Sequence, residues 1–428
     1  MSSLSQQMVC KFAVASSLLS LAFAAPSNKT CSTQLNVTSQ TDLDTISGCE
    51  VFRNSIHIGG DAAVLTLNGV QNITGDIYIY NATELTSFAA PELQEIKGSL
   101  DLEIVEVLST LSMPQLTDLG SIKLLTLPAL EELQFNAGVR NAKDILISDT
   151  SLKSLDGLNL SQVETFDVNN NKNIKDISID ATSISQLLDI SFNSENVNVS
   201  LPNLKWANNA TFRYCASVLM PELQSVNQSL GFINNTFYNV SADNLESVGG
   251  TFILSSNRNL QKASFAKLSK VGGGFVIANN SQYSDVAGFS NLSSVGGAID
   301  MVGNLTNASF PELNQVDGGV VVDSDNVFNC SVFDEAHENG DFHGDAYVCK
   351  GKSTTISTTL ASATATHSAS SSSDSHATTT TTHKSTESAS GSASSSATSS
   401  KHSKNGAVAN SAGLGLLGSL AALLFQFI

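Results

Sequence analysis

The sequence predicts a mainly β fold, a right-handed parallel β-solenoid of leucine-rich repeats. Three observations predict it: a leucine that recurs about every 22 residues, a Gly-Gly turn after that leucine, and a short alternating apolar segment after the turn. One short strand cannot bury its own apolar side. Successive coils must therefore stack, strand on parallel strand, at a spacing of about 4.8 Å.

The repeat is clearest in the second half of the chain. From Leu204 onward, the recurring leucines are 19, 22, 23, 24 and 21 residues apart. Gly-Gly follows Val248, Val271 and Val295, and the residues after each turn alternate as in a strand. These strand segments are 252–254, 275–277 and 299–301.

An asparagine recurs seven residues after the second glycine of the turn. It occurs at Asn257, Asn280 and Asn304, with Asn235 at the matching place one coil earlier. An inward asparagine at a coil corner can satisfy backbone groups and stack on its neighbours as a ladder. Because a buried ladder residue cannot carry a glycan, we predict that the glycosylation motif at Asn304 is empty.

Cysteine spacing predicts two local disulfides, one at each end of the solenoid. The pairs are Cys31 with Cys49 and Cys330 with Cys349, and each would stabilise the fold by about 3 kcal/mol on the chain-entropy model. Cys215 is then unpaired and falls one residue before the ladder corner of its coil. A buried free thiol is the preferred interpretation, with an intermolecular bridge as the alternative.

The two ends of the chain have the composition of processing signals. Residues 12–24 form an apolar run behind Lys11 that ends in Ala-Phe-Ala, which predicts a signal peptide over 1–24, with an N-terminal anchor helix as the alternative. Small residues, a short spacer and an apolar tail predict a GPI signal over 405–428. We expect the lipid at Asn405, and Asn410 is the weaker candidate.

A segment rich in Ser and Thr precedes the predicted anchor. In 353–403, 32 of 51 residues are Ser or Thr. Such a segment cannot bury enough apolar surface to fold, so 351–404 is expected to be an O-glycosylated stalk. An unmodified linker is the alternative.

Asparagine glycosylation motifs are dense in the body, residues 25–350. Fifteen Asn-x-Ser/Thr motifs occur there, which behind a signal peptide predicts a heavily glycosylated ectodomain. Besides Asn304 they are Asn28, Asn36, Asn72, Asn81, Asn159, Asn198, Asn209, Asn227, Asn234, Asn239, Asn279, Asn291, Asn307 and Asn329. From Asn209 onward none falls in the expected strand of the main sheet, so we expect that sheet to be a docking or self-packing face.

The charge of the body excludes nucleic acid as a partner. The net charge of the chain is −18, and residues 26–351 hold 16 basic against 37 acidic residues without a basic run. A nucleic-acid-binding surface needs Lys and Arg to displace counterions from phosphate.

Catalytic motifs are weak. Glycoside hydrolysis needs two carboxylates about 5 to 10 Å apart in a cleft, and Asp101 with Glu103 or Glu131 with Glu132 are the candidates. Alternation along a strand in an acidic chain explains both pairs. Asp149 opens an Asp-Thr-Ser that differs from the Asp-Thr-Gly of aspartic proteases, and we interpret it as a turn. No catalytic residue is expected.

The loop closed by the last cysteine pair is the only metal candidate in the sequence. His337 and His343 lack the spacing of a zinc-binding helix, and the acidic residues lack the alternate-ligand pattern of an EF-hand. A solvated capping loop is preferred to a divalent-cation site, so no metal and no cofactor are expected. The acidic residues are Asp334, Glu335, Glu338, Asp341 and Asp345.

These features together resemble the fungal GPI-anchored cell-wall organisation family, the extracellular-mutant and sporulation-specific wall proteins with receptor L-domain-like repeats. The resemblance rests on 91–93 through 98–100, on 221–223, on the Val-Gly-Gly repeats, and on the terminal cysteine pairs, stalk and anchor signal. It implies receptor L-domain-like halves at about 31–190 and 191–349. It also implies a non-enzymatic surface glycoprotein needed for wall organisation, biogenesis and integrity.

The partners implied are wall polysaccharide or mannoprotein, and the membrane through a GPI lipid. The expected location is the outer face of the plasma membrane, the cell wall, or both. Two other functions stay open: a wall-remodelling glycosidase or transglycosidase, and a ligand-binding surface sensor, which the predicted anchor leaves without a cytoplasmic domain.

Overall fold

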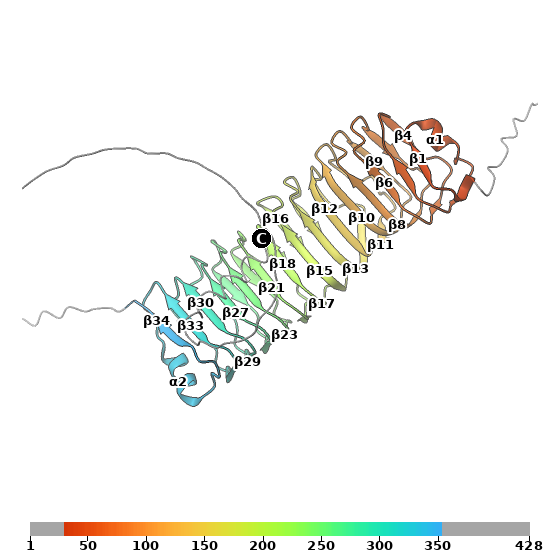
Figure 1. Ribbon diagram of the computed structural model, residues 1–428. Coiled ribbons are helices and arrows are strands. Elements are labelled where there is room, and N and C mark those ends of the chain that lie inside the picture. Colours follow the sequence, from red (N-terminus) through yellow and green to blue (C-terminus); the bar gives the residue numbers. More distant parts are fainter. Residues whose placement is uncertain (1–29, 353–428) are drawn as a thin grey trace, which may run out of the picture. The chain divides into compact units, whose positions relative to one another are not determined.

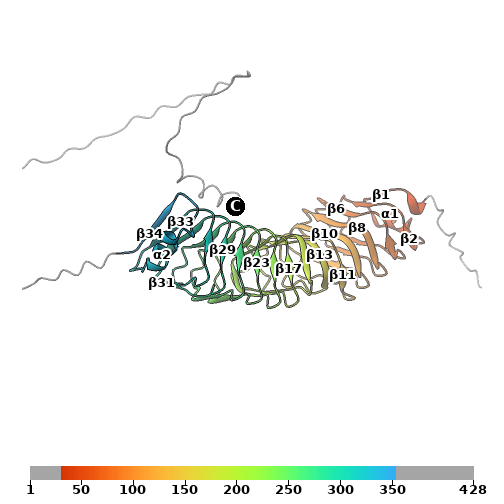
Figure 2. The same ribbon diagram turned by 90° about the horizontal axis from the view of Figure 1, so that it is seen from below.

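The computed structural model describes residues 30–352, and these form a parallel β-solenoid of about 13 turns. Figures 1 and 2 show the coils stacked in chain order, with α1 near the first coils and α2 near the last. The predicted fold class is confirmed. The predicted signal peptide, nearly all of the predicted stalk and the predicted anchor signal lie outside the described residues.

Two sides of each coil belong to one parallel sheet of 24 strands. Four long strands cover both sides: β8 (Glu95–Glu103), β10 (Asp118–Leu127), β13 (Leu158–Asn169) and β15 (Ser183–Ser191). The side that comes first in each coil is otherwise formed by β2 (Val51–Phe52), β5 (Asn72–Ile73), β11 (Val139–Asn141), β17 (Trp206–Ala207), β20 (Ser225–Val226), β23 (Ser247–Val248), β26 (Lys270–Val271), β29 (Ser294–Val295) and β32 (Gln315–Val316).

The second side, with the C-terminal parts of the four long strands, makes what we call the front face. Its other strands are β1 (Leu35–Val37), β3 (Ile56–Ile58), β6 (Ile77–Tyr80), β12 (Asp144–Thr150), β18 (Ala210–Arg213), β21 (Leu230–Ile233), β24 (Phe252–Ser255), β27 (Phe275–Ala278), β30 (Ile299–Gly303), β33 (Val320–Ser324) and β34 (Tyr347–Lys350). The segments predicted as strands at 252–254, 275–277 and 299–301 all lie here.

The third side consists of smaller parallel sheets. One has three strands, one has five and one has two. They are β4 (Val64–Thr66), β7 (Ser87–Ala89) and β9 (Thr110–Ser112); then β14 (Asp176–Ser178), β16 (Val197–Ser200), β19 (Cys215–Leu219), β22 (Asn239–Ser241) and β25 (Lys262–Ser264); then β28 (Asp285–Val286) and β31 (Asn307–Ala308).

The front face ends in the same backbone corner in most coils. One residue there takes the left-handed conformation, with φ between 50° and 61°, and turns the chain toward the third side. Asparagine tolerates this conformation better than most residues. The corner residues are Asn81, Ile104, Thr126, Asp149, Asn170, Phe192, Tyr214, Asn234, Ser256 and Asn279. Asp149 lies within β12, and its left-handed backbone makes it the corner of its coil, where the sequence context predicts a turn.

The core is a column of apolar side chains inside the coils. The leucines of the repeat, such as Leu245 and Leu268, are fully buried. Phenylalanine rings stack on the next coil, as Phe252 does on Phe275 with ring centroids 5.4 Å apart. Rings also meet across the interior, as Phe275 does with Phe289 at 4.9 Å, so each coil covers the apolar side of its own strands while neighbouring coils stack on it.

Each end of the solenoid carries a short helix and one disulfide. At the N-terminal end these are η1 (Thr30–Ser32), α1 (Gln40–Asp44) and the bond between Cys31 and Cys49. At the C-terminal end they are α2 (Ser331–Asn339) and the bond between Cys330 and Cys349. Both predicted disulfides are confirmed, and they hold the cap segments over the exposed ends of the sheet.

The predicted asparagine ladder exists, and it is confirmed for three of its four predicted members. The backbone N–H of Asn235 donates to Oδ1 of Asn257 at 2.9 Å, and that of Asn257 donates to Oδ1 of Asn280 at 2.8 Å. All three side chains are at most 3% exposed. A second ladder, which the sequence reasoning missed, runs from Thr150 through Asn171 to Asn193.

The prediction that Asn304 is a buried member of the ladder is wrong. Its side chain is exposed, and Leu305 is buried in its place. The corner before it is Gly303 with φ 136°, whereas the corner before Asn280 has φ 58°. This different backbone turns position 304 outward, so the ladder ends at Asn280, and burial no longer argues against a glycan at Asn304.

Cys215 is buried and free among the described cysteines, as predicted. It occupies the ladder position of its coil and not the residue before it, since its backbone N–H donates to Oδ1 of Asn235 at 2.8 Å. Burial raises the pKa of the Cys215 thiol to about 12. The thiol is therefore protonated and unreactive at neutral pH.

One sheet runs through the middle of the solenoid. Across positions 190 and 191, where the two receptor L-domain-like halves are predicted to meet, β15 pairs with both β17 and β18.

Candidate functional surface

The predicted glycosylation sites line the borders and the other sides of the solenoid. Asn28 lies outside the described residues. The other fourteen asparagines are exposed, except Asn72 and Asn209, which are half-buried. Asn81, Asn234 and Asn279 are corner residues at the border of the front face, and Asn198, Asn239 and Asn307 lie on the third side.

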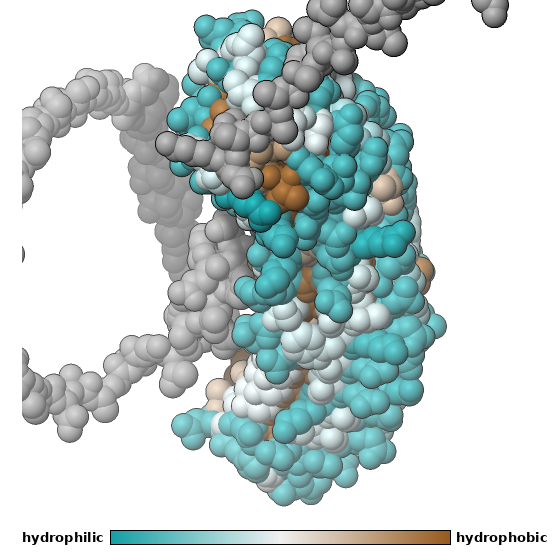
Figure 3. Space-filling view, turned by 90° about the vertical axis from the view of Figure 1, so that its right-hand side faces the viewer, coloured by the Kyte–Doolittle hydropathy of each residue, from teal (hydrophilic) through white to brown (hydrophobic). Residues whose placement is uncertain are grey.

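The front face carries no such motif on its strands beyond the first coil. Asn36 on β1 is the one exception among the described strands. The bare sheet expected for the second half of the chain thus extends from β3 to β34. Figure 3, a view of another side, shows a mostly hydrophilic surface on which apolar residues form small patches.

Aromatic and charged side chains gather on the first coils of the front face. The parallel register aligns His57 with Tyr78, Tyr78 with Asp101, and Asp101 with Lys123, which places them in one column. The neighbouring column aligns Tyr80 with Glu103. We call these residues the front-face strip: His57, Tyr78, Tyr80, Asp101, Glu103 and Lys123.

The rings of the strip are ordered by their strands. Tyr78 and Tyr80 are two residues apart on β6, so both point outward. Their rings are nearly parallel, at 4°, with centroids 6.0 Å apart, and His57 meets Tyr78 edge-on at 5.8 Å. Tyr80 is 47% exposed.

The charges of the strip are imbalanced. Lys123 Nζ lies 3.8 Å from Asp101 Oδ2 and also pairs with Glu103. Burial raises the pKa of Asp101, although Lys123 opposes this shift. Asp101 Oδ1 is out of contact with solvent and has no hydrogen-bond partner among the described residues. The strip therefore holds an acceptor that lacks a donor.

The later coils of the front face present aliphatic side chains. Ile253, Val276, Val321 and Val348 share one outward column, interrupted by Asp300 between Val276 and Val321. Burial raises the pKa of Asp300. This part of the face is weakly polar and lacks the aromatic rings of the first coils.

The candidate catalytic pairs lie on the outside of the solenoid, although the side chains of Asp101 and Glu103 are only 19% and 22% exposed. Asp101 and Glu103 are two residues apart on β8 and both engage Lys123. Glu131 pairs with Lys153, and both side chains are at least 60% exposed.

The two histidines between Cys330 and Cys349 have different partners. The His337 ring stacks on Tyr347 with centroids 4.3 Å apart, whereas His343 Nδ1 contacts Asp317 Oδ1 at 3.1 Å. Within residues 30–352, no group of three or more His, Cys, Asp or Glu side chains is arranged to hold a metal ion.

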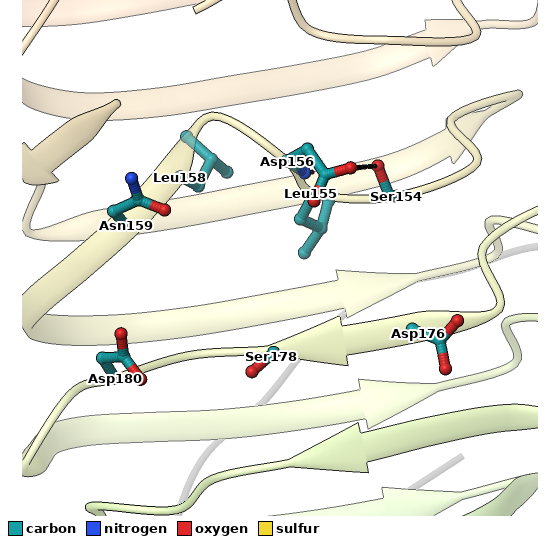
Figure 4. Close-up of a pocket in the computed structure, with 8 residues that line it drawn as sticks. All are labelled: Ser154, Leu155, Asp156, Leu158, Asn159, Asp176, Ser178 and Asp180. Carbon is teal, nitrogen blue, oxygen red and sulfur yellow. Dashed lines mark hydrogen bonds between the residues drawn. The ribbon is translucent and has the colours of Figure 1, made fainter. Parts of the chain in front are cut away.

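A pocket of about 290 Å³ opens where the third side is interrupted between β9 and β14. Figure 4 shows Asp176, Ser178 and Asp180 spaced along one segment, with Asp156 in the facing turn and Asn159 at the start of β13. Ser154 Oγ donates to Asp156 Oδ2 at 2.8 Å. Because Asn159 is a predicted glycan site, a sugar there would stand at the rim of this pocket.

Comparison with known proteins shows which proteins this chain is similar to. No family model matches it, and no solved structure matches it. It is 36% identical over 320 residues to the cell wall mannoprotein PST1 of Saccharomyces cerevisiae, which covers 74% of this chain and 72% of that protein. It is 33% identical over 340 residues to the cell surface GPI-anchored protein ECM33 of Candida albicans, covering 78% and 82%. The chain belongs to this fungal family of cell-wall and cell-surface proteins.

Other members of the family give the same picture. The protein ecm33 of Aspergillus fumigatus is 34% identical over 329 residues, covering 76% of this chain and 82% of that protein. The predicted family resemblance is confirmed, and the names of these members describe wall or surface proteins without an enzymatic activity. In residues 30–352 no helix is long and apolar enough to cross a membrane.

Proposed function

We propose that this chain is a non-enzymatic, GPI-anchored surface glycoprotein that organises the fungal cell wall and maintains its integrity. The observation that carries the proposal is the identity of 33 to 36% to family members named as cell wall mannoprotein or cell surface GPI-anchored protein, over about three quarters of the chain. The solenoid acts as a rigid binding surface, and its ligands are wall polysaccharide or mannoprotein.

The anchor follows from the ends of the chain. A signal peptide over 1–24 directs export, the stalk over 351–404 holds the solenoid away from the membrane, and a lipid replaces the tail after Asn405. Glycans on the predicted asparagines keep the acidic rod soluble among polysaccharides. The protein then resides at the cell surface, in the wall or in both.

The absence of catalysis is part of the proposal. A glycosidase holds its two carboxylates in a cleft on either side of a bound sugar. Asp101 and Glu103 instead lie two residues apart on one strand, β8, and share Lys123. This arrangement supports binding.

Gene deletion tests the proposal. Deletion is expected to make cells sensitive to chitin-binding dye and detergent, with rescue by the full-length chain. A form that ends before Asn405 is expected to be secreted into the medium, in an amount similar to that of the full-length chain at the cell. It is expected not to rescue the dye and detergent sensitivity of the deletion strain. Normal dye and detergent sensitivity in the deletion strain would contradict a role in wall organisation.

An enzymatic assay tests the non-enzymatic part separately. Purified protein is expected to leave β-glucan unchanged. Release or transfer of sugar by the protein, with loss of that activity in Asp101→Asn or Glu103→Gln, would show that the chain is a wall-remodelling enzyme.

A further inference from the structure

We infer that the front-face strip is a binding site for a neutral, linear polysaccharide. This inference rests on the proposed function and adds to it the surface that contacts the wall and the chemistry of the ligand. Four properties of the strip carry it: its aromatic rings, its carboxylate acceptors, its charge and the position of the predicted glycans around it.

The rings offer exposed aromatic surface. Tyr78 and Tyr80 occupy adjacent outward positions of one strand, and their nearly parallel rings are stacked on each other. An exposed aromatic ring packs well on the C–H face of a sugar, because both surfaces are flat and apolar while their edges are polar. Tyr80, which is 47% exposed, is the ring with the most surface free for such packing.

The carboxylates offer acceptors for sugar hydroxyl groups. Glu103 stands beside Tyr80 in the register and Asp101 beside Tyr78, so each ring has an acceptor one coil away. Asp101 Oδ1 has no donor among the described residues. Because this oxygen is out of contact with solvent, a sugar hydroxyl reaches it only when a neighbouring side chain shifts. Lys123, whose Nζ lies 3.8 Å from Asp101 Oδ2 and whose side chain is 35% exposed, is the neighbour that would exchange its ion pairs for solvent.

The charge of the strip selects a neutral ligand. Two carboxylates face one ammonium group. Beyond Lys123 the outward column continues through Leu146 to Asp167 and Asp189. An anionic polymer on this column would meet like charges at short range, whereas a neutral polymer of hexoses would not.

The predicted glycans select a narrow ligand. Asn81 follows Tyr80 directly at the corner of the coil, and Asn36 aligns with His57 at the start of the column. Glycans at these positions stand beside the strip and at its end. They leave an open path across β6, β8 and β10 that admits a single extended chain and excludes a globular protein.

Binding of purified polysaccharides tests the inference. The full-length mature protein, purified in detergent with its glycans, is run in native gels that contain laminarin, mannan or polygalacturonate. Retardation is expected with a neutral polymer, laminarin or mannan, and not with anionic polygalacturonate. Tyr80→Ala is expected to weaken binding at least tenfold, and Tyr80→Phe to preserve it because the ring face remains.

A matched control separates the strip from general surface effects. Tyr238 is 61% exposed but lies before β22 on the third side, so Tyr238→Ala is expected to bind as the unmodified protein does. Asp101→Asn and Glu103→Gln are expected to weaken binding without loss of solubility. Near-ultraviolet circular dichroism shows whether each variant keeps its fold.

Three outcomes would overturn the inference. They are absence of retardation by either neutral polymer, equal binding by the Tyr80→Ala variant, and binding that appears only after enzymatic removal of the N-glycans. The last outcome would mean that the protein's own glycans cover the rings. If deletion weakens the wall but the Tyr80→Ala variant binds and rescues fully, the site is wrong and the proposed function stands. If deletion has no effect on the wall, the proposed function itself fails.

Discussion

Asn257 and Asn280 are joined twice across adjacent coils. The backbone N–H of Asn257 donates to Oδ1 of Asn280 at 2.8 Å, and Asn257 Nδ2 donates to the same oxygen at 3.0 Å. The Oδ1 of Asn257 accepts the same pair of bonds from Asn235. Each buried amide thus satisfies the corner of the coil before it, so one side chain supports two coils.

Removing one of these side-chain amides should therefore lower the free energy of unfolding. The Asn257 side chain accepts hydrogen bonds from Asn235 and donates one from Nδ2 to the Phe232 carbonyl oxygen at 3.0 Å. In Asn257→Ala these donors and this oxygen lose their partners in a buried site. We expect a loss of about 3 kcal/mol in the free energy of unfolding, measured by urea denaturation. Exposed Asn314→Ala should change it by less than about 0.5 kcal/mol, and equal effects of the two would contradict the ladder.

The Gly-Gly turns stack backbone on backbone. A Cβ at Gly272 would overlap the carbonyl oxygen of Gly249 in the preceding coil. A Cβ at Gly274 would meet the Thr251 methyl group at 3.5 Å and the Ala298 carbonyl oxygen at 3.6 Å, which are ordinary contact distances. Gly272→Ala is expected to cost about 1–3 kcal/mol through forced separation of the coils. Gly274→Ala serves as the matched control, and its melting temperature should stay near that of the unmodified protein.

The thiol of Cys215 should not react with thiol reagents in the folded protein. Because burial raises its pKa to about 12, only about one molecule in ten thousand holds a thiolate at pH 8. We expect no labelling by a disulfide reagent at pH 8 until the mature protein is unfolded, and then one equivalent. Rapid labelling of the native protein would refute this prediction. So would a dimer in non-reducing electrophoresis that a thiol reductant converts to monomer.

Asn304 should be accessible to glycosylation. Its side chain is exposed and donates to the Ser281 carbonyl oxygen at 3.2 Å at the surface. Glycopeptide mapping is expected to find sugar on this asparagine, and Asn304→Gln to remove the mass of one glycan. An empty motif at Asn304 in protein whose other exposed motifs are occupied would count against this placement.

Much of the fold follows from local sequence. The period of about 22 residues, the Gly-Gly turns and the paired cysteines predict the solenoid and both disulfides, because each depends on residues close in the chain. Asn171 and Asn193 were missed as ladder residues, although each directly follows a left-handed corner residue, Asn170 or Phe192. Their coils lack the Gly-Gly turn from which the ladder position is counted.

The front-face strip shows the limit of sequence reasoning. Tyr78 and Lys123 are 45 residues apart, and each of them is unremarkable in its own coil. Coil lengths vary from 19 to 24 residues, so counting along the chain does not give the register between coils. Parallel pairing of β6 with β8 and of β8 with β10 brings the two tyrosines and the acid–lysine group onto one surface.

The sequence by itself determined what repeats in this protein: a strand, a turn, a buried leucine and a terminal disulfide, each set by nearby residues and by the need to bury apolar surface. Only the tertiary structure decided which side chains meet. The left-handed corners and the backbone hydrogen bonds between coils set the register, and one change of backbone at Gly303 turned Asn304 from the core to the surface.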